Sequence, residues 1–278
     1  MLRIWQKTEK QKLEPVGMGT AFPFLKEKNH VVSIIGGGGK TTLLYEMVGF
    51  CVKNDQKVLV TTSTHIYRPP KEWHDQSLEA VERKFRTGRA AIIGSACRDP
   101  EKLSMPETEL FEEARKKADL TLIEADGARH LPCKAPAEHE PALLSSSDLV
   151  IGVTGLSALG QPLGKGCFRA ERAAELLGCT MEHHITEEDL ARLIASEQGQ
   201  QKDLKGRTFY AVLHQYEEKE HRAAAEKLVE LLRRQGIEHV LVTCATGNRR
   251  QSGENTNPWY GRAELPVREA EEEWEPGE

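Results

Sequence analysis

The sequence predicts an α/β protein with a mainly parallel sheet flanked by helices. Short runs of β-branched and other apolar residues recur along the 278-residue chain, and segments with helical periodicity lie between most of them. This alternation is typical of parallel strands joined by helices that cover both faces of a sheet. Four consecutive glycines also join one expected strand to one expected helix. Because such sheets bind ligands beyond the carboxyl ends of their strands, we expect the functional site at that edge.

The expected strands are short apolar runs, as buried strands are. They span residues 30–35, 57–62, 90–94, 119–124, 148–153, 209–213 and 239–243. One helix is expected after Lys40, where apolar residues recur at helical spacing, and another through residues 221–236, where it stops at Gly236. These elements fill one α/β domain, which we place at residues 22–245.

Composition excludes several classes of protein. The chain is 38% apolar and 29% charged, which is ordinary for a soluble protein. No run approaches the ~18 apolar residues of a membrane span, and the N-terminus lacks the apolar core of a signal peptide. The six cysteines form no C-x-x-C pair, so neither a disulfide framework nor a zinc knuckle is expected. We therefore predict a cytoplasmic protein with no membrane partner.

The two ends of the chain are set apart from this domain. Residues 1–21 are interpreted as an N-terminal extension, and residues 246–278 as a polar, acidic and mobile tail because they lack periodicity. The last ten residues carry six Glu and no Lys or Arg, so without them the net charge of −5 becomes about +1. A nearly neutral body argues against a nucleic-acid partner.

The stretch IIGGGGKTTLL, residues 34–44, is interpreted as a phosphate-binding loop. Ile34 stands where the pattern G-x-x-x-x-G-K-[ST] has its first glycine, but the shorter form G-x-x-G-K-T fits from Gly36. Glycines let successive backbone N–H groups turn towards an anion, and the helix N-terminus adds partial positive charge. The expected nucleotide-binding residues are Gly36, Gly37, Gly38, Gly39, Lys40, Thr41 and Thr42. The alternative is a glycine-rich turn whose lysine points to water.

Each polar residue of this loop has an expected role. Lys40 would reach the β- and γ-phosphates, Thr41 would hold Mg²⁺ through its hydroxyl, and Thr42 would bind another phosphate oxygen. Such a site also needs an acid on a neighbouring strand to hold the metal or its water shell. Glu124 ends an expected strand and Asp126 follows it, so either could be the catalytic, metal-linked acid. Asp126 is equally well explained as a turn residue.

Two further segments carry candidate substrate or partner residues. Thr64 and His65 follow the strand at residues 57–62. The connection at residues 125–147 has three prolines and no sustained period, so we expect a lid or substrate loop. Its candidate residues are Arg129, Lys134, Glu138, His139 and Glu140. A metal site at residues 138–140 and a chalcogen-handling role for Cys133 are weaker alternatives to solvated side chains and an inert thiol.

Four sequence blocks together resemble the YqeC family, accessory proteins for selenium-dependent molybdenum hydroxylases. The blocks are IIGGGGKTTLL, VLVTTSTHI, LIEADGARHLPCKAPAEHEP and VTGLSALGQPL, and the similarity extends roughly from Phe22 to Cys244. The third block is the most specific, since G-K-T occurs in many unrelated nucleotide-binding proteins. The resemblance implies a P-loop NTPase-like fold and a part in maturing a selenium-containing molybdenum cofactor. It marks as candidate site residues Lys40, Thr41, Glu124, Asp126, Lys134, Glu138, His139 and Glu140.

Motifs and resemblance together predict an Mg²⁺-dependent nucleotide-binding protein. We expect a slow NTPase that couples its nucleotide state to insertion or modification of a selenium-bearing metal cofactor, with the hydroxylase or its cofactor as partner. One alternative is a kinase or ligase that activates a small acid, because G-x-x-G-K-T-T also resembles the short loop of Mur-type ligases. The other is a non-catalytic, nucleotide-dependent switch or carrier for a partner enzyme.

The residues after the strand at 209–213 bear on the choice of base. Guanine-selective P-loop proteins commonly present an Asn and an Asp near the end of a late strand, and related sequences often read L-N-Q-x-D there. This chain has His214, Gln215 and Glu217 instead, so the Asn is missing and the acid is longer. We therefore expect ATP to bind at least as well as GTP. The alternative is that these residues only cap the strand.

Overall fold

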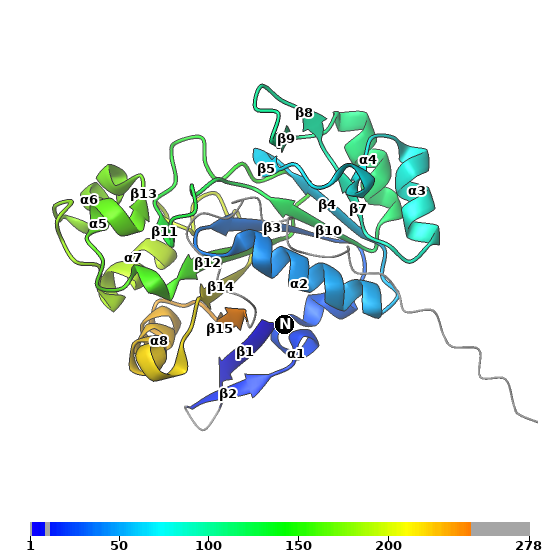
Figure 1. The fold of residues 1–278 in the computed structure, drawn as a ribbon. Helices are drawn as coiled ribbons and strands as arrows, with labels where there is room; N and C mark the ends of the chain where they lie inside the picture. The colour runs from blue at the N-terminus through cyan, green and yellow to red at the C-terminus, as the bar shows by residue number, and fades with distance from the viewer. Residues whose placement is uncertain (1, 9–11, 246–278) are drawn as a thin grey trace, which may run out of the picture.

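A ten-stranded sheet organises the computed structural model, which describes residues 2–8 and 12–245. Its strands lie in the order β2-β1-β15-β14-β12-β3-β10-β4-β7-β6 (Figure 1). Neighbours from β15 to β6 pair in parallel, while β1 and β2 are antiparallel. Helices flank the sheet, so the predicted α/β class with a mainly parallel sheet is confirmed. The expected tail at residues 246–278 lies outside the described residues.

The main sheet contains β1 (Leu2–Lys7), β2 (Leu13–Val16), β3 (His30–Gly36), β4 (Val58–Thr62), β6 (His74–Asp75), β7 (Ala91–Ile93), β10 (Leu120–Glu124), β12 (Leu149–Gly155), β14 (Thr208–His214) and β15 (His239–Ala245). Two small sheets contain β5 (His65–Tyr67), β8 (Ser95–Ala96) and β9 (Lys102–Ser104), and β11 (Cys133–Lys134) and β13 (Cys167–Phe168). The α-helices are α1 (Met18–Ala21), α2 (Lys40–Lys53), α3 (Leu78–Arg86), α4 (Thr108–Lys117), α5 (Leu163–Gly166), α6 (Ala170–Leu177), α7 (Glu187–Ala195) and α8 (Glu218–Arg234). Short 3₁₀ helices are η1 (Pro23–Lys26), η2 (Lys71–Trp73) and η3 (Leu156–Ala158).

All seven apolar runs form strands of the main sheet, with ends that differ by at most two residues from the expected ones. The two predicted helices are also present. α2 begins at Lys40, and α8 begins at Glu218 and ends before Gly236, whose φ of 84° suits a glycine after a helix. Sequence periodicity therefore predicts the elements that carry the glycine loop.

The strands separate two apolar cores, one on each face of the sheet. Along β3, Val31 and Ile35 belong to the core that also holds residues of α3, α4, α7 and α8. Val32 and Ile34 point the other way, into the core beneath α1, η1 and α2. This alternation follows from the two-residue period of a strand. Burial on both faces explains why the strands are almost continuously apolar.

The segment placed before the domain, residues 1–21, contributes to the same sheet. β1 pairs with β15, with Leu2 opposite Ala245, and β2 extends the edge beyond β1. Trp5 of β1 also packs edge-on against Tyr216, with ring centroids 4.8 Å apart. These strands continue the sheet of the α/β domain, and the boundary at residue 22 stays a prediction.

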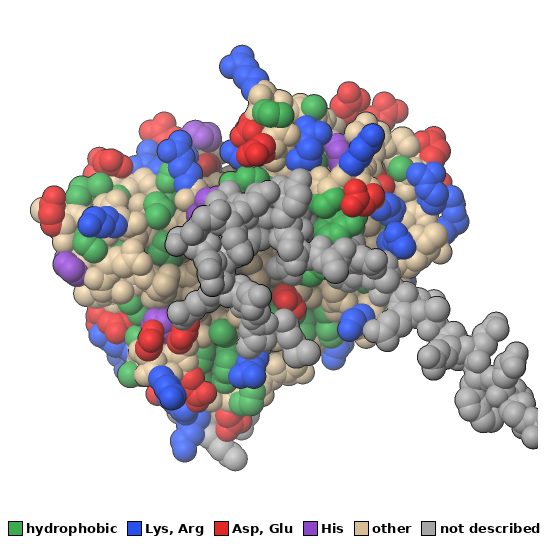
Figure 2. Space-filling view, in the orientation of Figure 1, with side chains coloured by type: hydrophobic (Ala, Val, Ile, Leu, Met, Phe, Trp, Pro, Cys, Tyr) green, Lys and Arg blue, Asp and Glu red, His purple; other side chains and the backbone are tan. Residues whose placement is uncertain are grey.

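The face of the molecule in Figure 2 carries acidic and basic side chains interspersed with one another. No helix in the described part of the chain combines the length and the apolar character needed to cross a bilayer. Charge and hydropathy thus identify neither a broad basic face in this view nor a bilayer-spanning helix among the described elements.

Candidate functional site

The glycine loop lies at the carboxyl edge of the sheet, where several strands end together. It follows β3 and leads directly into α2. β3 lies between β10 and β12, so that Glu124 pairs with Ile34 on one side and Val153 pairs with Gly36 on the other. This topology brings polar residues from four chain segments to one place.

Close approach of neighbouring backbone and rings explains glycines in this loop. Gly36 has a φ of 92°, and a Cβ there would lie 2.1 Å from the Val153 carbonyl oxygen. Gly39 has a φ of 139°, and its Cβ would lie 2.1 Å from Cδ2 of His214. Any larger residue would be strained and would collide. The glycine run is thus required by packing as well as by backbone conformation.

Four consecutive backbone N–H groups of the loop and helix, at residues 38–41, donate to no acceptor within the described part of the chain. The preceding amides are used, since Gly37 N–H donates to the Val153 carbonyl at 2.9 Å and Gly36 N–H donates to Asp126. α2 begins at Lys40, so its partial positive charge adds to these donors. A row of free amides at a helix N-terminus is suited to hold an anion.

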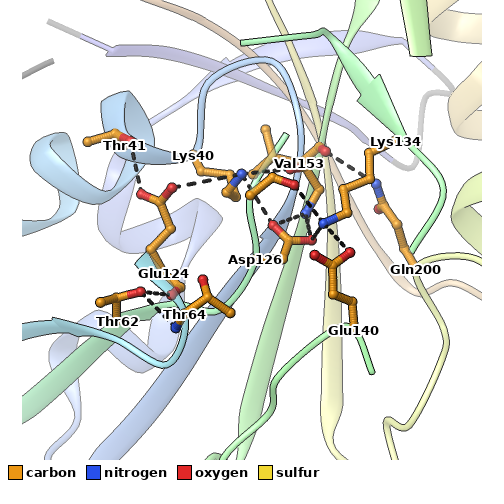
Figure 3. Close-up of polar contacts among 12 residues, drawn as sticks. Lys40, Thr41, Thr62, Thr64, Glu124, Asp126, Lys134, Glu140, Val153 and Gln200 are labelled. Carbon is orange, nitrogen blue, oxygen red and sulfur yellow. Dashed lines mark hydrogen bonds and ion pairs between the residues drawn. The ribbon is translucent and has the colours of Figure 1, made fainter. Parts of the chain in front are cut away.

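Lys40 is buried among oxygen atoms beside this loop. Its Nζ donates to the Gly36 carbonyl at 2.7 Å and forms ion pairs with Asp126 Oδ1 at 3.2 Å and Glu124 Oε1 at 3.9 Å (Figure 3). Burial favours the neutral amine, but the charges of Asp126 and Glu124 outweigh it and raise the pKa of Lys40. The ammonium is therefore charged at neutral pH and available to neutralise an anion.

Glu124 connects the end of β10 to the first turn of α2. Its Oε2 accepts a hydrogen bond from Thr41 Oγ1 at 2.9 Å, and its carbonyl accepts one from Thr62 Oγ1 at 2.7 Å. Burial raises the pKa of Glu124, since it outweighs the opposing effects of the Lys40 charge and the Thr41 hydrogen bond. Thr64 lies beside it in Figure 3, and among the described residues its buried hydroxyl has no hydrogen-bond partner. This side of the site thus retains unused polar groups.

Asp126 has a different environment, although it is only two residues away. Both carboxylate oxygens accept from Gly36 N–H, at 3.1 and 2.9 Å, and the side chain also pairs with Lys40 and Lys134. The residue is 2% exposed. Its carboxylate is therefore shared between the glycine loop and two lysines.

The chain of charges continues from Asp126 towards α6. Lys134 Nζ contacts Asp126 Oδ2 at 3.0 Å, Glu140 Oε2 at 2.7 Å and the Gly127 carbonyl at 2.7 Å. Arg169 forms two hydrogen bonds with Glu140, at 2.7 and 3.1 Å. Burial opposes ionisation of Glu140, but Lys134 and Arg169 outweigh it and lower the pKa of this carboxyl. The ion pairs link the glycine loop to the start of α6 without a break.

The segment at residues 125–147 contributes a short strand and buried side chains to this site. Its short strand β11 pairs with β13, and Lys134 and Glu140 are buried. Glu138 and His139 point outward instead, and Arg129 is also exposed. Among the described residues, no three His, Cys, Asp or Glu side chains are grouped to hold a metal ion. The geometry therefore separates Glu140 from its two neighbours and does not support the alternative metal site there.

The remaining predicted residues lie around the edge of the network. Thr42 is partly buried in the first turn of α2, and His65 is exposed on β5. Cys133 is buried beside Cys167. Thr64 lies beside Glu124 in Figure 3.

The end of β14 also reaches the glycine loop. His214 is buried against Gly39 and its Nδ1 lies 2.7 Å from Thr243 Oγ1. Burial lowers the pKa of His214 to about 4, so the ring is neutral at pH 7. Gln215 has a φ of 62°, and its Oε1 accepts from Ser157 Oγ at 2.5 Å. These two residues are in place beside the loop, whereas Glu217 is the N-cap residue of α8.

Three residues of this site were not selected from the sequence. Arg169 is 29 residues from its partner Glu140, and Phe168 precedes it at the end of β13. Gln200 is buried near Gly36 and donates to Thr154 Oγ1 at 2.8 Å and to the Val153 carbonyl at 3.2 Å. None of them follows an expected strand end, and a single sequence contains no other signal for them.

Fold and site together define an α/β protein whose glycine-rich strand-to-helix loop meets a buried charged network at the carboxyl edge of a parallel sheet. The family model described as YqeC protein matches residues 32–171. The chain is also 30% identical over 224 residues to "Uncharacterized protein YqeC" of Escherichia coli (strain K12), covering 76% of this chain and 85% of that protein. The chain therefore belongs to the YqeC family. No solved structure gives a significant match.

Proposed function

We propose that this protein binds a nucleoside triphosphate with Mg²⁺ at the glycine loop and hydrolyses it slowly, in the manner of P-loop NTPases. The observation that carries the proposal is the row of free N–H groups at residues 38–41, next to the buried ammonium of Lys40. These groups supply the donors that a triphosphate needs at the N-terminus of a helix.

Lys40 would neutralise the terminal phosphates. Its ion pairs with Asp126 and Glu124 are 3.2 and 3.9 Å long, and its shortest contact is to a neutral carbonyl. A phosphate oxygen could replace that carbonyl at little cost, because charge-assisted hydrogen bonds are stronger than neutral ones.

Thr41 and Glu124 would hold Mg²⁺ and its water shell. Their side chains are already joined by a 2.9 Å hydrogen bond, and hydroxyl and carboxylate oxygens are ligands that suit Mg²⁺. When bound, the metal would supply charge neutralisation on the β- and γ-phosphates. Asp126 is engaged by Gly36 N–H and both lysines, so we assign it the orientation of the loop and assign the metal to Glu124.

The residues at the end of β14 do not favour guanine over adenine. Gln215 is held by Ser157, and the neutral ring of His214 is buried against Gly39. Neither supplies the paired acceptors that guanine donors need. We expect ATP to bind at least as well as GTP in competition for one fluorescent nucleotide. A preference for GTP of about a hundredfold would show that Glu217 reads guanine.

The physiological role that we propose is assistance in the maturation of selenium-dependent molybdenum hydroxylases. Its support is the resemblance of the four sequence blocks and membership of the YqeC family. Phosphate release would be measured after adding the apo-hydroxylase and, separately, candidate small acids. Stimulation by the hydroxylase supports the proposed role, stimulation by an acid supports a kinase or ligase, and nucleotide binding without turnover supports a switch.

The direct test of the nucleotide site is the variant Lys40→Ala. We expect its ATP affinity, measured by calorimetry with Mg²⁺, to fall about tenfold to a hundredfold, because one charge-assisted contact is lost. Lys53→Ala is a matched control, since Lys53 is exposed at the other end of α2. Equal affinities of the wild type and Lys40→Ala would remove the glycine loop from the function.

A further inference from the structure

Three cationic side chains gather around the ring of Phe168 at the far end of the charged network. The guanidinium carbon of Arg169 lies 4.4 Å from the ring centroid, that of Arg129 lies 5.3 Å away, and Lys134 Nζ lies 5.7 Å away. Contacts of this kind are attractive within about 6 Å. Like charges nevertheless repel one another, so such a group needs anions to balance it.

Only part of this positive charge is balanced within the protein. Glu140 pairs with both Lys134 and Arg169, and Asp126 pairs with Lys134. Arg129 has no ion pair with any described residue, and its side chain is exposed. Its guanidinium therefore offers a planar pair of donors to solvent, in the geometry that matches a carboxylate or a phosphate.

The position of Arg129 relates it to the glycine loop. A Cβ on Gly37 would lie 2.6 Å from the Leu131 carbonyl oxygen, and one on Gly38 would lie 2.8 Å from that of Pro132. The turn that carries Arg129 is thus in direct contact with the loop. Lys134 connects the two places a second time, since it contacts Asp126 as well as the Phe168 ring.

Backbone strain shows that the position of Arg129 is enforced. Arg129 and His130 have φ values of 46° and 63°, and Arg169 has a φ of 58°. Left-handed conformations are uncommon for such residues and cost of order 1–3 kcal/mol each. Two of them, Arg129 and Arg169, hold their guanidinium groups over the Phe168 ring. His130 lies against the ring of Tyr67.

We propose that Arg129, Phe168 and Arg169 form a subsite for the oxyanion, a carboxylate or phosphate group, of a small second substrate beside the nucleotide. The role as a second-substrate site rests on the proposed nucleotide function. The oxyanion takes the free donors of Arg129, while Arg169 and Lys134 add positive charge. Phe168 packs against the stem of the bound molecule.

Binding of two probes to the full-length protein tests this subsite. Inorganic phosphate and succinate are titrated separately, with binding followed by ³¹P and ¹H NMR of the probes. The glycine loop is occupied by ADP and Mg²⁺ in one series and weakened by Lys40→Ala in another. Each series is measured with and without Arg129, so that only the change caused by Arg129→Ala reports the second site. We expect Arg129→Ala to weaken binding of at least one probe about tenfold or more in both series. The probe that responds identifies the oxyanion.

Two further variants make the result specific. Arg129→Lys keeps the charge but loses the planar pair of donors, so it should recover only part of the affinity. Arg3→Ala removes an exposed arginine from β1, which lies next to the edge strand β2 and is separated from β10 by four strands of the sheet, and should change nothing. Affinities for both probes within about twofold of the parent protein after Arg129→Ala would overturn the subsite. Failure of the nucleotide proposal would show separately, as absence of ADP binding to wild type.

Discussion

The glycine loop and the segment at residues 125–147 each bury one lysine beside Asp126, but they hold it differently. Lys134 has three oxygen partners at 2.7, 2.7 and 3.0 Å, two of them carboxylates. Lys40 has one carbonyl at 2.7 Å and two carboxylates at 3.2 and 3.9 Å. A buried ammonium has three donors, and those of Lys134 are all used at short range. Lys134 thus behaves as a structural group, whereas Lys40 keeps contacts that a ligand can replace.

The first test of this comparison is Lys134→Ala. We expect the variant to lose about 3–5 kcal/mol of unfolding free energy, because Glu140 and Asp126 would stay buried without their shared partner. Urea unfolding followed by circular dichroism measures the loss. Lys116→Ala, which removes an exposed lysine paired with Glu113, should cost no more than about 1 kcal/mol. Equal losses in the two variants would show that Lys134 is not structural.

A second test separates the two acids at the end of β10. Glu124→Gln should lower Mg²⁺-dependent hydrolysis about a hundredfold with little loss of stability, since burial already disfavours the charge of Glu124. Asp126→Asn should destabilise the protein as well, because it weakens contacts with two lysines and Gly36 N–H. Turnover and urea unfolding are measured for both. Wild-type turnover in Glu124→Gln would move the metal role elsewhere.

The smallest expected effect concerns the neutral ring that packs on the glycine loop. The pKa of His214 is about 4 in the folded protein and near 6.5 when unfolded, so only the unfolded chain gains this proton as the pH falls through that window. His214 should therefore cost about 2 kcal/mol of stability between pH 6.5 and pH 5. The free energy of unfolding is measured with urea at these two pH values, and His214→Asn should lose this part of its pH dependence. His139→Asn, at an exposed histidine, should retain it.

Local sequence patterns predict the position of the candidate site at the carboxyl edge of the sheet. The apolar run before Gly36 and the helical period after Lys40 place the loop between β3 and α2. Glu124 and Asp126 follow another apolar run, so their arrival at the same edge is a consequence of parallel pairing. Which partners Glu124 contacts and which Asp126 contacts depends on the direction of the backbone after β10, and the sequence pattern does not specify that direction.

Long-range contacts explain what could not be predicted. Arg169 reaches Glu140 from the start of α6, and Gln200 reaches Gly36 from the segment before β14. β1 is short and half-buried, so its pairing with β15 has no strong periodic signal. In each case the tertiary fold determines the contact partner, because the residue type alone is compatible with many different partners.

The pairing of β1 with β15 also has a consequence for synthesis on the ribosome. β1 is the first described strand to be made, and its only neighbour besides β2 is the last. The hairpin of β1 and β2 must therefore wait without its neighbour in the sheet until nearly the whole chain has emerged, and two strands alone are marginally stable in water. A nascent chain stalled before residue 239 would present this hairpin to chaperones, and only the arrival of β15 would let the sheet close around it.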